Sequence, residues 1–400
     1  MERDILGKIG LRKEEGGRDS GKTPAKPRRY FDFTLLFIVI FLIALGLIMV
    51  YSISAYNATK YYDDATLFVR NQARYAAVGI LLMLLVSKVD YHIYSARFGV
   101  GKVKTTLIII GYLVALILQV AVHFRGDGTN GSNRWFSFGK FVKLQPSELS
   151  KVMLILMVAF IVYMSPKRLD RMVGFGRIIV FTGPMIFFVA LENLTTALIM
   201  AAIVFIVPFV ASRKKWYFGA VFLIVVVVGL IFIKLEGYRA ARVQVWLDID
   251  NAPGGYQIRQ GLYAIASGGW FGKGLGNSIQ KLGYIPEVHT DMIFTCIVEE
   301  LGIVGGLFLV AMYVILLARI FQIATHAPDL LGSLIAVGVF VQIAFQAILN
   351  IAVVTNTIPS TGIPLPFISY GGSSLLFLLV EVGLVLNVSG QIDYDAALQQ

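Results

Sequence analysis

Ten long apolar runs decide what this sequence can fold into. A helix needs about 20 predominantly apolar residues to cross the hydrocarbon core of a bilayer. Of the 400 residues, 57% are hydrophobic and only 15% are charged, which is more apolar surface than one soluble core can bury. The runs lie at about 32–51, 73–88, 104–122, 148–164, 177–191, 195–211, 216–234, 291–318, 331–354 and 371–390.

The runs lack the alternating pattern of about ten residues that marks a membrane β-strand. The sequence therefore predicts an all-α polytopic membrane protein with about ten transmembrane helices. We expect residues 31–390 to form one transmembrane domain. In it, a large extracytoplasmic loop at 235–290 separates the seventh span from the eighth.

Lys and Arg residues set the predicted orientation. The first 30 residues carry nine of them together with five glycines and two prolines, which is typical of a disordered basic tail. If this tail is cytoplasmic, its side of the membrane holds 21 Lys and Arg residues against 11 on the other. The positive-inside rule then places both tails, 1–30 and 391–400, in the cytoplasm. Anionic inner-leaflet lipid accounts for the net charge of +11, so no nucleic acid is implied.

A polar cluster lies at the start of the eighth run. The stretch "YIPEVHTDMIF" contains Glu287, His289, Thr290 and Asp291 and leads directly into "MIFTCIV". Asp291 has two interpretations: an N-terminal helix cap, which the helix dipole favours, or a carboxylate that meets water or a ligand at the membrane surface. The residues alone leave both open.

Cationic residues collect in the predicted outer loop at 124–147. It holds Arg134, Lys140 and Lys143, and Trp135, Phe136 and Phe138 lie among them. Such cations either belong to an interfacial aromatic belt or bind a phosphorylated lipid head group, because Arg can engage phosphate oxygens with two hydrogen bonds.

Charged residues inside the apolar runs are rarer. Glu148 and Lys151 lie three apart and so share a helix face. Glu299 and Glu300 lie about 12 to 13 Å along the predicted helix from the polar cluster. A buried carboxylate in a membrane must be paired, neutral or facing a polar cavity. Structural pairing, for instance with Lys151 or Arg242, and a polar cavity both stay open.

Two further stretches contain turn-forming residues. "TNTIPSTGIPLPFISYGGSSLLF" (355–377) has three prolines, which predict a rigid loop, and its Ser369 and Ser373 offer hydroxyls. "GKGLGNS" in the large loop is glycine-rich, but it lacks the spacing of a Walker A or GxGxxG motif. A nucleotide site is therefore not predicted.

Three stretches together carry a family resemblance: "NRWFSFGKFVKLQPSELSK", "GYQIRQGLYAIASGGWFGKGLGNSIQKLGYIPEVHTDMIFTCIVEELG" and "NTIPSTGIPLPFISYGGSS". They resemble the SEDS family (shape, elongation, division, sporulation), represented by RodA, FtsW and SpoVE. The resemblance covers residues 31–390, and "GLGNSIQKLGYIPEVHTD" is more similar to the division and sporulation branch. One stretch departs from the family: its usual "QPDLGT" is replaced by "LENLTT" at 191–196, with Glu192 and Asn193 in place of Pro-Asp. A role carried by that Asp is therefore in doubt, and Glu192 is a candidate to substitute for it.

The resemblance implies a peptidoglycan glycosyltransferase of the bacterial cytoplasmic membrane. Such an enzyme polymerises lipid II at the outer face, working with a class B penicillin-binding protein. The family's catalytic Asp corresponds to Asp291, the expected general base toward a sugar hydroxyl. The leaving pyrophosphate needs cationic side chains or a divalent cation, Mg²⁺ or Mn²⁺, whose ligands the sequence does not reveal. The expected substrate-binding residues are Arg134, Lys140, Lys143, Glu287, His289, Thr290, Ser369 and Ser373.

Two other functions stay open. A flippase for a lipid-linked precursor would need a polar path, which Glu148, Lys151, Glu299 and Glu300 could line, but the sequence shows no inverted repeat. A noncatalytic scaffold for division proteins would leave the cluster around Asp291 without a role.

Overall fold

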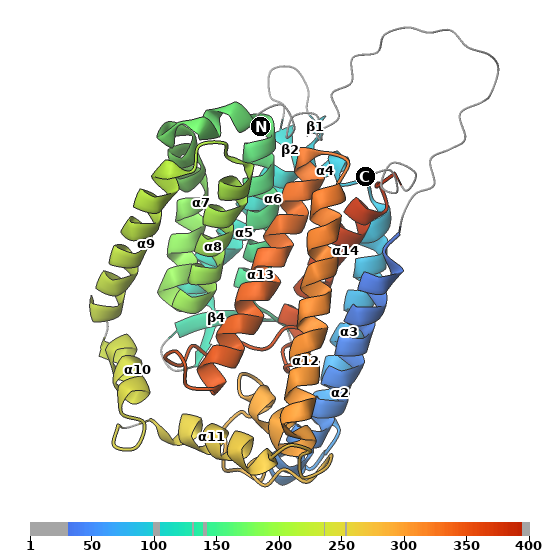
Figure 1. Cartoon of the computed structure of the whole chain (residues 1–400), viewed down its shortest axis with the longest axis vertical. Helices are drawn as coiled ribbons and strands as arrows, with labels where there is room; N and C mark the ends of the chain where they lie inside the picture. The colour runs from blue at the N-terminus through green and yellow to red at the C-terminus, as the bar shows by residue number, and fades with distance from the viewer. Residues whose placement is uncertain are drawn as a thin grey trace, which may run out of the picture.

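The computed structural model describes residues 31–98, 105–129, 132–138, 142–235, 237–252 and 254–393. The predicted tail at 1–30, residues 394–400 of the second tail and Lys140 lie outside the described residues. Long helices run up and down a single bundle, and one shorter helix lies across one end of it (Figure 1).

Ten long helices coincide with the ten apolar runs, so the predicted fold class is confirmed. Within the described residues nine are long and apolar enough to cross a membrane, and the tenth, α9, matches the run at 216–234. They are α2 (Phe33–Tyr62), α3 (Leu67–Lys88), α5 (Leu107–Arg125), α6 (Pro146–Met164), α7 (Met172–Glu192), α8 (Leu194–Ala211), α9 (Trp216–Leu235), α12 (Ile293–His326), α13 (Leu330–Val354) and α14 (Gly372–Ser389).

Two of these helices are longer than a bilayer crossing requires. α2 has 30 residues and α12 has 34. At about 1.5 Å per residue α2 is about 45 Å long, whereas the hydrocarbon core is about 30 Å thick. The 34 residues of α12 are divided by Gly302, whose backbone is not helical, and the part after Gly302 is by itself long enough to cross that core. The apolar runs at 32–51 and 291–318 therefore underestimate both helices, because a helix can continue past the lipid into polar sequence.

The described chain begins and ends at the same end of the bundle. The N–H of Asp32, just before α2, donates to Ser389 Oγ at the end of α14 over 3.2 Å. The opposite end, which we call the loop end, carries α10 (Gly237–Leu247) and α11 (Tyr256–Gly268) (Figure 1). The segment predicted as a large loop is thus partly helical, and α11 packs against α12.

A small sheet lies in the segment predicted as an outer loop at 124–147. Strands β3 (Asp127–Thr129), β4 (Ser132–Phe138) and β5 (Val142–Leu144) form an antiparallel sheet in the order β3-β4-β5. Because β4 packs against α5, α6 and α7, its side chains are held on the bundle. The remaining short elements are α4 (His92–Ser95), β1 (Arg97–Phe98), β2 (Thr105–Thr106) and the 3₁₀ helix η1 (Pro166–Asp170).

Helices α6, α13 and α14 form the most buried part of the bundle. Glycines let neighbouring helices approach closely there. A Cβ atom on Gly338 of α13 would lie 2.6 Å from the Ile155 side chain of α6, and one on Gly383 of α14 would lie 2.7 Å from the Met83 carbonyl of α3. This tight centre surrounds several buried polar side chains and keeps them away from the outer surface of the bundle.

Candidate active site

Asp291 lies at the loop end, immediately before α12. The N-cap residue of α12 is Met292, and its side chain makes no capping hydrogen bond. The first helical bond runs from the Thr295 N–H to the Met292 carbonyl over 3.1 Å. The interpretation of Asp291 as a helix cap is therefore wrong, and its carboxylate is left for another role.

The surroundings of Asp291 make it a stronger base than an exposed Asp. The side chain is half-buried, and burial raises its pKa; the nearby charge of Glu287 acts in the same direction. The Thr290 hydroxyl, which donates to Asp291 Oδ1 over 3.3 Å, and the positive charge of Arg242 partly offset that increase in pKa. A carboxylate with a raised pKa suits general-base chemistry near neutral pH.

The other members of the predicted cluster shape the turn before Asp291. Glu287 has a positive φ of 46°, and its carbonyl accepts hydrogen bonds from the Thr290 N–H over 3.0 Å and from the Thr290 hydroxyl over 2.7 Å. The His289 ring packs against Phe68 with centroids 4.5 Å apart. Burial lowers the pKa of His289 to about 4, so this imidazole is neutral at physiological pH. The Glu287 side chain is exposed and lies on the open side of the turn.

Ser369 and Ser373 use their hydroxyls within the protein. Ser369 Oγ accepts a hydrogen bond from the Leu365 N–H over 2.8 Å, and Ser373 donates to the Lys143 carbonyl. Their contacts hold the proline-containing segment and β5 in place. Substrate binding by these hydroxyls stays a prediction.

Arg134 lines a pocket at the loop end. The pocket is small, with room for about one water molecule, and its walls come from α5, α6, α7 and β4 and from residues next to them. Its lining residues are Gln119, Arg134, Gln145, Ser147, Val189, Glu192 and Asn193. Lys143 is exposed and does not line this pocket, so the structure separates two of the cations that the sequence grouped.

In the altered motif "LENLTT", one residue caps a helix and its neighbour carries the negative charge. Asn193 caps α8, accepting hydrogen bonds from the N–H groups of Thr195 and Thr196 over 3.1 and 3.2 Å. Asp would cap equally well, so only the charge of the family's Asp is lost at this position. Glu192 carries a carboxylate one residue earlier, and its Oε1 lies 2.5 Å from His123 Nδ1.

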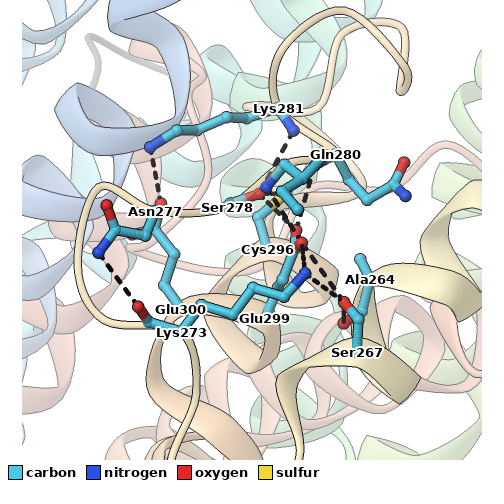
Figure 2. A network of polar contacts seen from close by, with 11 residues as sticks. Ala264, Ser267, Lys273, Asn277, Ser278, Gln280, Lys281, Cys296, Glu299 and Glu300 are labelled. Atoms are coloured by element: carbon cyan, nitrogen blue, oxygen red, sulfur yellow. Dashed lines mark hydrogen bonds and ion pairs between the residues drawn. The ribbon is translucent and has the colours of Figure 1, made fainter.

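Glu299 and Glu300 are buried ion-pair partners of the segment that precedes Asp291. Figure 2 shows Lys273 and Ser278 converging on Glu299, with Lys273 Nζ 2.7 Å from its Oε1. Lys281 Nζ lies 2.9 Å from Glu300 Oε1. The partners are thus Lys273 and Lys281, not Lys151 or Arg242, and neither Glu lines an open path, because both are fully buried.

Gly302 breaks α12 just after these two glutamates. Its φ of 74° is not helical. The carbonyls of Glu299 and Glu300 accept hydrogen bonds from the N–H groups of Lys273 and Gly274, each over 2.9 Å. In return, the N–H groups of Ile303 and Val304 donate to the carbonyls of Gly269 and Trp270. The segment at 269–274 is therefore bound to α12 by both backbone and side chains.

Glu148 and Lys151 form a third carboxylate–lysine pair, 3.0 Å apart and buried, on α6. Their predicted position on one helix face is confirmed. Glu381 of α14 accepts a hydrogen bond from Gln342 of α13 over 2.6 Å. These carboxylates lie in the tight centre of the bundle, where each has a partner.

The structure adds Arg242 and Asn350 to the surroundings of Asp291. Asn350 Nδ2 donates to the Asp291 carbonyl over 2.8 Å, and Arg242 contributes a positive charge. The sequence gives one signal for Asn350: Gln342, Gln346 and Asn350 recur every four residues in an apolar run, which places them on one helix face. Among the described residues, His, Cys, Asp and Glu side chains form no group of three that could hold a metal. The divalent cation stays a prediction.

These features define a polytopic membrane protein that has a carboxylate with a raised pKa, Asp291, at one end of its bundle. The chain belongs to the family described as Cell cycle protein, which groups FtsW, RodA and SpoVE and matches residues 33–394. Membership in the SEDS family is therefore confirmed.

Relatives cover nearly the whole chain. It is 38% identical over 367 residues to Stage V sporulation protein E of Bacillus subtilis (strain 168), covering 90% of this chain and 96% of that one. It is 36% identical over 368 residues to a Geobacter sp. (strain M18) protein named "Probable peptidoglycan glycosyltransferase FtsW", with the same coverage.

Solved structures share the fold. A chain from a study titled "Structural coordination of polymerization and crosslinking by a peptidoglycan synthase complex" is similar with a TM-score of 0.74 and 28% identity, covering 91% of this chain and 98% of that one. Rod shape determining protein RodA of Thermus thermophilus is similar with a TM-score of 0.65 and 27% identity, at the same coverage.

Proposed function

We propose that this chain is a peptidoglycan glycosyltransferase that polymerises lipid II into glycan strands at the outer face of the cytoplasmic membrane. One observation carries the proposal: Asp291 is a half-buried carboxylate with a raised pKa that takes no part in capping α12. Relatives named as glycosyltransferases over most of the chain support the same chemistry.

The reaction requires a base for a weak nucleophile. The 4-hydroxyl of an acceptor GlcNAc attacks the anomeric carbon of the donor, and Asp291 takes the hydroxyl proton as the new C–O bond forms. The bond between the anomeric carbon and the pyrophosphate oxygen breaks, and the electron pair leaves with undecaprenyl pyrophosphate. Arg242 sits near enough to lower the pKa of Asp291 and so limits how far burial raises it.

The leaving pyrophosphate needs positive charge. Arg134 supplies it, with Gln145 and Ser147 beside it as hydrogen-bonding groups. We assign Lys143, on the exposed surface of β5, to a first contact with the lipid head group. Mg²⁺ or Mn²⁺ could neutralise the pyrophosphate further. The proton transfer to Asp291 and the binding of pyrophosphate by Arg134 do not require such an ion.

The partner we propose is a class B penicillin-binding protein, which would crosslink the strands. A structural neighbour from a peptidoglycan synthase complex supports such an assembly. The flippase alternative loses its main support, because Glu148, Glu299 and Glu300 each pair with a lysine instead of lining a path. The scaffold alternative leaves the raised pKa of Asp291 without a use.

Glycan formation from lipid II by the purified protein tests the proposal, with and without the cognate class B protein. Asp291→Asn should reduce polymerisation by about 10² to 10⁴, the usual contribution of general-base assistance. The variant should still bind the class B protein. Normal polymerisation by Asp291→Asn would move the base elsewhere, with Glu287 next in line.

A further inference from the structure

The carbonyl of Asp291 lies outside the hydrogen-bond ladder of α12. The ladder begins one residue later, at the carbonyl of Met292. The Asp291 carbonyl accepts instead from Asn350 Nδ2, near the end of α13, over 2.8 Å. A side chain from another helix therefore fixes the peptide plane that follows Asp291.

Asn350 bridges two chain segments. It is 1% exposed, and the same Nδ2 also donates to the Ile363 carbonyl over 2.7 Å. An amide NH₂ group has two hydrogens, so each carbonyl receives one. Neither an ionised carboxylate nor an apolar side chain of similar size can make both bonds.

The second segment, residues 360–366, is itself held by side chains. It contains Pro364 and Pro366, which have no N–H to donate. Three of its other carbonyls accept hydrogen bonds from side chains of α10, α8 and α13: Ser360 from Arg242 over 3.0 Å, Thr361 from Thr195 over 3.4 Å and Pro364 from Gln346 over 3.0 Å. Contacts from three helices leave this segment little freedom, so it gives Asn350 a fixed reference.

We propose that Asn350 is a positioning residue for the reaction of Asp291. It ties the main chain of Asp291 to the 360–366 segment and thereby fixes the position of the carboxylate beside Gly362. The inference rests on the proposed function for the identity of the base. A displacement of about 1 Å at a reacting group can cost about 100-fold in rate, so loss of the tether should lower kcat.

Gln346 provides a matched control. It lies one turn earlier on the same face of α13, is as deeply buried as Asn350 and donates to Pro364, but it makes no hydrogen bond to Asp291. In Gln346→Met the contacts from Arg242 and Thr195 still hold the 360–366 segment, so only the link to Asp291 distinguishes the two variants. We compare Asn350→Leu with Gln346→Met in lipid II polymerisation by the full-length protein. Asn350→Leu should lower kcat by about 10- to 100-fold with KM within about threefold, and Gln346→Met should stay within about threefold in both. Equal losses in the two variants, in proportion to their loss of Tm, would overturn the proposal.

A second measurement does not depend on turnover. A carbodiimide with glycine ethyl ester labels accessible carboxyl groups, and peptide mass spectrometry gives the rate at Asp291. That rate should change several-fold in Asn350→Leu and stay at the wild-type value in Gln346→Met. Equal rates in all three proteins would refute the tether. If the labelling rate at Asp291 changes in Asn350→Leu but the wild-type protein does not polymerise lipid II, the tether is supported and the proposed function is rejected.

Discussion

Asp291 lies so close to Gly362 that a Cβ atom added to the glycine would be 3.7 Å from Asp291 Oδ2. Gly362 also has a φ of 68°, a conformation that glycine adopts far more readily than other residues. The backbone conformation thus favours glycine at the position next to the Asp291 carboxylate.

The activity should depend on the ionisation of Asp291. Because burial raises its pKa, we expect kcat/KM to rise with pH through a range above the ordinary Asp pKa of about 4. His289, with a pKa of about 4, is already neutral near pH 7, so its titration does not change the rate there. Measured kcat/KM should rise with pH across this range in the wild type, and the residual activity of Asp291→Asn should not.

Thermal stability should change with pH in the opposite direction to activity. A raised pKa means that the folded protein holds this proton more tightly than the unfolded chain does. The associated stability is fully present below the unfolded pKa and is lost as pH rises through the folded pKa. The wild-type Tm should therefore fall relative to that of Asp291→Asn across that window. If the wild-type Tm instead rises relative to that of the variant as pH increases, Asp291 does not have a raised pKa.

Substitution of Arg134 should affect substrate use more than folding. Arg134→Ala removes the cation of the pocket shared with Gln145 and Glu192, so we expect KM for lipid II to rise by about tenfold or more, since a charge-assisted hydrogen bond contributes about 1.5 to 3 kcal/mol. Lys143→Ala, on the exposed strand, is the control and should change KM less. An unchanged KM in Arg134→Ala would return this segment to the interfacial-belt interpretation.

The ion pair between Lys281 and Glu300 should matter for stability. Both side chains are buried, and removal of one member of a buried pair typically costs about 3 to 5 kcal/mol, because the other charge stays without a partner. Glu300→Gln and Lys281→Met should each lower Tm in detergent. The double variant should lose less than the sum of the two.

A surface pair gives the matched control. Arg70 and Asp64 lie 2.9 Å apart but are well exposed, and such pairs contribute about 0 to 1 kcal/mol. Asp64→Asn should leave Tm almost unchanged. Additive losses in the Lys281 and Glu300 variants would show that the two residues act independently.

The predicted orientation can be tested with single cysteines. The native Cys296 is buried, so an impermeant maleimide should report only introduced sites. Asp250→Cys, where the side chain is 75% exposed, should be labelled in intact cells. Lys214→Cys, in a short connection at the other end of the bundle, should be labelled only after permeabilisation. The reverse pattern would invert the topology.

Local patterns in the sequence predicted the helices well and their tertiary partners poorly. Each apolar run became a helix because a membrane-spanning segment must satisfy its own backbone. Lys273 and Lys281 were not predicted to pair with Glu299 and Glu300, since such pairing depends on how the segment before Asp291 folds back. A sequence pattern contains no record of that contact.

The active site was predicted to a similar extent. Asp291 stood out because polar residues at the edge of an apolar run are unusual, and the family resemblance gave it a role. Its tether, Asn350, lies 59 positions away along the chain and looks like one more polar residue near a helix end. Strands β3 to β5 were missed because segments of three to seven residues are too short for a clear alternating pattern.

The break at Gly302 separates an excursion of the chain at the loop end from the membrane helix that follows it. The excursion starts at Gly269 and closes at Ile303, where the N–H of Ile303 meets the carbonyl of Gly269 over 2.9 Å. Its two ends are therefore fastened to each other, like the base of a hairpin. Insertions at its exposed tip, around Leu282 and Tyr284, can lengthen the excursion without changing the register of the rest of α12. The loop end of the protein is in this sense free to vary in length, whereas the membrane helices are not.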